Sequence, residues 1–80
     1  MRLSPVRHVL HLNKMAEGLI ADAIRDAARG GRAVLLEVQA NGYLRSISPS
    51  EVGTVSATVS DLVGQFEGMR VDICSQIPEA

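Results

Sequence analysis

Residues 33–48 read AVLLEVQANGYLRSIS, two apolar, β-rich runs on either side of Asn41-Gly42. An Asn-Gly pair between two such runs is the strongest short signal for a β-hairpin, because a type I′ turn needs a positive φ at both central positions. We therefore predict strands at Ala33–Ala40 and Tyr43–Ser48, joined by a two-residue loop.

This loop length fixes a register in which Ala40 faces Tyr43, Val38 faces Arg45 and Leu36 faces Ile47. Side chains alternate between the two faces of a strand. One face then carries Val34, Leu36, Val38, Tyr43 and Ile47. The other face is mixed and carries Leu35, Glu37, Gln39, Leu44 and Ser46.

The segment before the hairpin has apolar residues at helical spacing, so we predict a helix over Pro5–Arg29. Ser4 suits the N-cap and Gly30-Gly31 ends the helix. Asn13 and Glu17 interrupt the apolar side. Either the helix breaks near Asn13, which then caps a second helix beginning at Lys14, or the two polar residues form a pair in a helix–helix interface.

The segment after the hairpin predicts a second helix and a third strand. Ser48-Pro49-Ser50-Glu51 is a capping box with proline at the first helical position, and the helix that it opens extends to Glu67. Met69–Ile77 alternates apolar and polar residues, which is typical of a half-buried strand.

The predicted fold is a single α+β domain with the order α-β-β-α-β. The most apolar strand, Ala33–Ala40, belongs at the centre of the sheet. We therefore expect a three-stranded antiparallel sheet of order 2-1-3, with both helices packed on one face.

Composition excludes several classes of protein. Among the 80 residues the single cysteine rules out an intrachain disulfide and a zinc site built from several cysteines. No apolar run is long enough to span a membrane, and the start lacks the apolar core of a signal peptide, so we expect a cytoplasmic location. The preference for Arg over Lys, with many Ala, Val and Gly, suggests a GC-rich bacterial, phage or mobile-element gene.

No catalytic or metal site is predicted. His8 and His11 lie three residues apart on the predicted helix, but the sequence places no third ligand beside them. Cys74 has no histidine near it in the chain, and Glu37 with Asp72 is a pair that Arg70 can neutralise. We expect no enzymatic activity and no cofactor.

Charge is unevenly distributed along the chain. Residues 1–32 carry six cationic and three acidic side chains, a net charge of +3, whereas residues 33–80 carry two and six, a net charge of −4. The first helix therefore has a basic side that suggests an alternative function as a nucleic-acid-binding regulator. Its candidate phosphate contacts are Arg7, His11, Lys14, Arg25 and Arg29.

Protein binding is the function that we favour from the sequence. The first helix has more apolar surface than a short sheet covers, which predicts a homodimer. The expected dimer interface is Leu12, Asn13, Met15, Glu17 and Leu19.

Small residues on the second helix form a strip. The strip is either a docking surface or a set of small residues that an exposed helix face tolerates. With the outer leucines, the predicted partner-binding residues are Gly53, Ala57, Ser60, Gly64, Leu35 and Leu44. The chain is then an accessory regulator or inhibitor.

Overall fold

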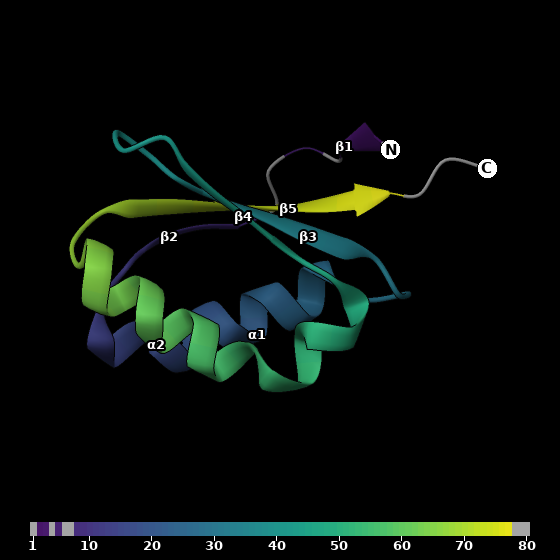
Figure 1. Ribbon diagram of the computed structural model, residues 1–80, viewed down its shortest axis with the longest axis horizontal. Coiled ribbons are helices and arrows are strands. Elements are labelled where there is room, and N and C mark those ends of the chain that lie inside the picture. The colour runs from purple at the N-terminus through teal and green to yellow at the C-terminus, as the bar shows by residue number, and fades with distance from the viewer. Residues whose placement is uncertain (1, 4, 6–7, 78–80) are drawn as a thin grey trace.

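The structure, a computed structural model, describes residues 2–3, 5 and 8–77. A β-sheet forms one layer and two helices form the other, both on the same face of the sheet (Figure 1). The elements in chain order are β1 (Arg2–Leu3), β2 (His8–His11), a 3₁₀ turn (Lys14–Ala16), α1 (Glu17–Ala27), β3 (Ala33–Val38), β4 (Tyr43–Ile47), a 3₁₀ segment (Pro49–Thr54), α2 (Val55–Phe66) and β5 (Arg70–Ile77).

The sheet is antiparallel and β5 is its most connected strand. Its order is β1-β5-β3-β4, and β2 also pairs with β5, on the side that β1 occupies. The predicted α+β domain with an antiparallel sheet and two helices on one face is confirmed, and so is the order of the three predicted strands. The predicted number of strands is wrong, because β1 and β2 add to the free side of β5 and make five.

The first predicted helix is wrong in its N-terminal part. His8–His11 form strand β2, and His8 pairs with Ile73. The sequence of residues 8–11, HVLH, has no two-residue alternation that would indicate a strand, and pairing with β5 satisfies its backbone groups. The predicted N-cap Ser4 lies outside the described residues.

Of the two alternatives for Asn13 the structure shows the cap, although strand β2 and not a first helix precedes it. The Asn13 side-chain oxygen accepts a hydrogen bond from the Met15 N–H at 2.8 Å, and helical structure begins at Lys14. Asn13 is exposed, so it is a cap and not half of a buried polar pair.

The hairpin forms, but its register differs from the prediction by two residues. Val38 pairs with Tyr43 and Val34 with Ile47, which leaves a four-residue loop. The loop is not the expected type I′ turn, because positive φ occurs at Ala40 (67°) and Gly42 (76°) and not at Asn41. A shift of two positions keeps every side chain on its predicted face.

The core lies between the helices and the inner face of the sheet. Ser48 and Glu51 form the predicted capping box at the start of the second helical segment. The rings of Tyr43 and Phe66, 5.1 Å apart, close one end of the core. The largest fully buried side chains come from every layer: Leu12, Ile20, Ile24, Leu36, Ile47, Leu62 and Ile73, with five valines.

Candidate protein-binding surfaces

The sheet face opposite the helices, here called the outer sheet face, is not covered by any described element (Figure 1). Residues that are directly opposite each other in an antiparallel pair lie on the same face, so the register identifies its members. These are Leu3, Val9, His11, Ala33, Leu35, Glu37, Gln39, Leu44, Ser46, Arg70, Asp72, Cys74 and Gln76.

Exposed apolar side chains concentrate on the outer sheet face. Five large hydrophobic residues among those described are exposed, and three of them, Leu3 (56%), Val9 (47%) and Leu44 (58%), lie on this face. Leu35 and Cys74 are opposite each other at its centre and are half-buried. The structure thus places the two predicted partner-binding leucines, Leu35 and Leu44, on one face.

A fixed polar group lies among these apolar side chains. The Asp72 carboxylate is buried on the outer sheet face, where it accepts hydrogen bonds from Arg70 Nε at 2.9 Å and Gln39 Nε2 at 2.6 Å. Because both oxygens have a donor, Asp72 does not need water to satisfy it. The predicted neutralisation of Asp72 by Arg70 is therefore present.

Cys74 is a free, half-buried thiol. Burial raises the pKa of the Cys74 thiol above its usual value, and the negative charges of Asp72 and Glu37 add to the shift. A raised pKa disfavours the thiolate, which is the nucleophilic form of cysteine. Among the described residues, no three His, Cys, Asp or Glu side chains gather to hold a metal ion.

The two histidines lie on opposite faces of the sheet. His8 points toward the helix layer, where its Nε2 lies 3.1 Å from Asp26 Oδ2 and links β2 to α1. His11 is opposite Arg70 on the outer sheet face. The helical spacing that suggested a shared ligand pair does not exist in β2.

The residues predicted for a dimer interface are divided by the structure. Leu12 is fully buried in the protomer, held by a hydrogen bond from its N–H to the Met69 carbonyl oxygen at 2.8 Å. Asn13 caps the 3₁₀ turn, and Glu17 is half-buried at the start of α1. Met15 (95%) and Leu19 (65%) remain exposed near the N-terminal end of α1.

The predicted basic helix face is also divided. Arg7 lies outside the described residues, His11 is in β2 and Lys14 precedes α1. Arg25 is in α1 and pairs with Asp22 at 3.1 Å, and Arg29, in the turn after α1, pairs with Asp26 at 3.0 Å. The nucleic-acid hypothesis thereby loses the single surface on which it rested.

The small-residue strip on the second helical segment is open. Gly53, Ala57, Ser60 and Gly64 are all exposed, and a Cβ added at either glycine would meet nothing within 4 Å. The strip is therefore not a docking groove for α1 within the protomer. Gly64 borders a hollow of about 280 Å³ that Lys14 and Glu17 line from the other side.

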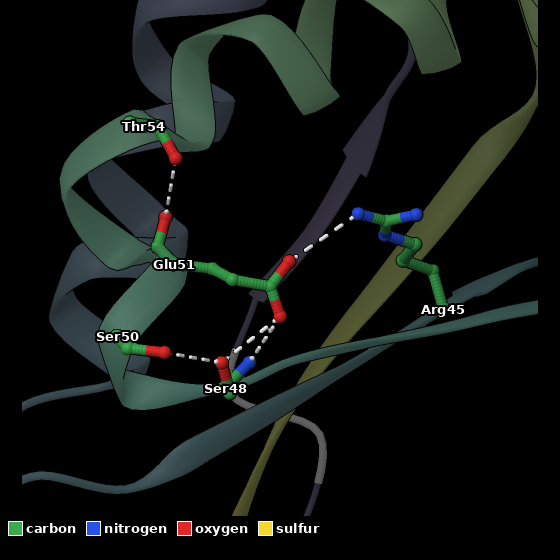
Figure 2. Close-up of polar contacts among 5 residues, drawn as sticks. All are labelled: Arg45, Ser48, Ser50, Glu51 and Thr54. Carbon is green, nitrogen blue, oxygen red and sulfur yellow. Dashed lines mark hydrogen bonds and ion pairs between the residues drawn. The ribbon is translucent and has the colours of Figure 1, made fainter.

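The sequence did not indicate a second hollow, between β4 and α2. It has a volume of about 220 Å³ and is lined by Tyr43, Arg45, Ala57, Thr58, Asp61 and Leu62. Figure 2 shows the contacts that hold the Arg45 side chain, whose Nη2 lies 3.4 Å from Glu51 Oε2. The other carboxylate oxygen, Glu51 Oε1, accepts hydrogen bonds from the Ser48 N–H at 3.1 Å and from the Ser48 hydroxyl at 2.9 Å. These Ser48 donors, more than Arg45, lower the pKa of Glu51.

Comparison with protein-family models, curated proteins and solved structures found no match to this chain. In the part of the chain that the structure describes, no helix has the length and apolar character needed to cross a bilayer.

We predict that Gly64→Leu raises the free energy of unfolding by about 1 kcal/mol, because leucine is a better helix former than glycine and the space around Gly64 is open. Thermal unfolding measures the effect. Gly68→Leu is the matched control and should destabilise, because Gly68 has a φ of +88°. A lower melting temperature for Gly64→Leu would show that the strip is packed.

We also predict that Glu51→Gln destabilises the protein at neutral pH and that the difference disappears in acid. The pKa of Glu51 is lower in the folded chain than in the unfolded chain, so its ionised carboxylate stabilises the folded state. This stabilisation is fully present above the unfolded-state pKa of Glu51, and it is lost as the pH falls through the lower folded-state pKa. Melting temperatures across pH test this, with Glu67→Gln at an exposed position as the control. A Glu51→Gln deficit that persists in acid contradicts it.

Proposed function

We propose that the chain is a small non-enzymatic protein-binding module that works as a homodimer, an accessory regulator or inhibitor of bacterial, phage or mobile-element origin. The supporting observation is that Leu3, Val9 and Leu44 are all exposed on the one sheet face that no described element covers. Val9 and Leu44 lie in one row across the sheet with Asp72 and Glu37 between them, so the proposed surface mixes exposed apolar side chains with charged ones, as non-obligate interfaces do.

The polar residues of the outer sheet face suit the same function. Non-obligate interfaces mix apolar contacts with polar groups, and a polar group buried on binding costs free energy only when it loses its partners. Asp72 already has its partners, Arg70 and Gln39, within the protomer. A target can therefore cover this group without leaving its charge unsatisfied.

The absence of assembled catalytic groups in the described residues favours binding over catalysis. The raised pKa of Cys74 keeps its thiol protonated. On the outer sheet face the nearest histidine in register, His11, is opposite Arg70, four positions along β5 from Cys74. Four positions correspond to about 13 Å, which is beyond the reach of a general base.

The expected target-binding surface can be tested without disturbing β4. The double variant Leu3→Ser/Val9→Ser removes exposed apolar side chains at the β1/β2 edge of the outer sheet face. We expect an immobilised wild-type chain to retain a protein from its native host that this variant loses by about tenfold or more, as the loss of two apolar contacts implies.

The matched control is Met15→Ser/Leu19→Ser, which removes two equally exposed apolar side chains at the N-terminal end of α1. It should retain the target as the wild type does. Equal retention by all three chains would reject the outer sheet face as the binding surface, and loss only in the control would assign binding to α1.

A further inference from the structure

The two edges of the sheet differ in how they are protected. One edge is divided into β1, of two residues, and β2, of four, with Pro5 between them. Interruption and proline are common ways of preventing a sheet edge from pairing with another chain. β4, at the other edge, is a continuous five-residue strand without proline. Its one charged residue, Arg45, lies on the helix-facing side, where Nη2 is 3.4 Å from Glu51 Oε2.

The hydrogen bonding of β3 shows which backbone groups of β4 are free to pair. Gln39 N–H donates to Arg70, so odd-numbered residues at this end of β3 direct their backbone groups at β5 and even-numbered ones at β4. Val38 and Leu36 therefore bond to their partners Tyr43 and Arg45. The N–H and C=O groups of Leu44 and Ser46 are directed away from the sheet.

We infer that β4 pairs antiparallel with β4 of a second copy, which joins the two sheets into one continuous sheet. The inference rests on the homodimer in the proposed function and specifies its interface. A two-fold symmetric strand pair places one residue opposite its own copy. With Leu44 at that position, the two Leu44 residues exchange N–H···O=C bonds, and their side chains, 58% exposed in the protomer, cover each other.

The side chains of β4 favour this register over its neighbours. A register centred on Arg45 sets two guanidinium groups directly opposite each other, which is destabilising. A register centred on Ser46 places Leu44 opposite Ser48, and therefore leaves the exposed Leu44 side chain facing a polar residue instead of its own copy. Centring on Leu44 instead places Tyr43 opposite Arg45 of the second copy, an arrangement that allows a cation–π contact.

The hollow between β4 and α2 is lined by one carboxylate, Asp61, and by the protomer's own Arg45, whose charge is paired with Glu51. Tyr43 and Asp61 both line it, on the side of β4 that faces the helices. An Arg45 side chain that enters from the second copy, opposite Tyr43, meets an aromatic ring and a carboxylate. A second copy of this chain therefore fits the open edge in both its backbone and its side chains.

Disulfide trapping tests the register directly. In a Cys74→Ala background, Leu44→Cys places two thiols opposite each other, with Cα atoms about 5.5 Å apart, within the range of a disulfide. Ser46→Cys is the matched control, exposed on the same face of the same strand. In the Leu44 register the two copies of residue 46 are four positions apart, about 13 Å, too far for a disulfide. We expect about tenfold more cross-linked dimer from Leu44→Cys than from Ser46→Cys.

Sedimentation of the wild-type chain separates the two ways of failing. In the Leu44 register three residues of β4 in each copy pair with β4 of the other, which makes a small interface, so the dimer should appear at high micromolar concentration. If the wild type dimerises but Leu44→Cys does not cross-link, or Ser46→Cys cross-links as well, pairing through β4 in this register is rejected and the homodimer stands. A wild-type monomer at high micromolar concentration rejects both.

Discussion

The pairing of β5 with strands on both of its sides is the interaction on which the structure depends. β5 bonds to β3 along one side and to β1 and β2 along the other, so it joins the N-terminal segment to the hairpin. Each of its inner-facing residues, such as Ile73, enters the core beneath the helices, while Asp72 and Cys74 face outward. A single alternating strand thus builds the core and the centre of the outer sheet face.

Two helices cover only one side of this sheet, and the consequences are an open face and an open edge. The open face carries Leu3, Val9 and Leu44 in exposed positions, with the satisfied carboxylate of Asp72 between apolar neighbours. The open edge is β4, whose continuous backbone contrasts with the divided edge formed by β1 and β2. The proposed protein binding would use the face and the proposed self-pairing would use the edge, and Leu44 belongs to both.

Local signals in the sequence predicted most of the fold. Asn41-Gly42 identified the hairpin, the capping box at Ser48 identified the second helix, and alternation identified β5. The strand at residues 8–11 could not be recognised locally, because only its partner in β5 distinguishes it from a helix. The predicted hairpin register was wrong because the loop places its positive φ values at Ala40 and Gly42, and not at the Asn41-Gly42 pair on which the two-residue turn was based.

The candidate surfaces were predictable to a smaller extent. The mixed face of the hairpin pointed to Leu35 and Leu44, which the structure places together, because alternation alone decides the face of a strand. Leu12 was assigned to an interface only because a helix was expected around it, and the structure buries it in the core.

Amide hydrogen exchange at low and high protein concentration tests the central claim most directly. The account predicts that the Leu44 and Ser46 amides become protected as concentration rises, while the β5 amides are protected throughout. Exchange at Leu44 and Ser46 that does not change with concentration would contradict it.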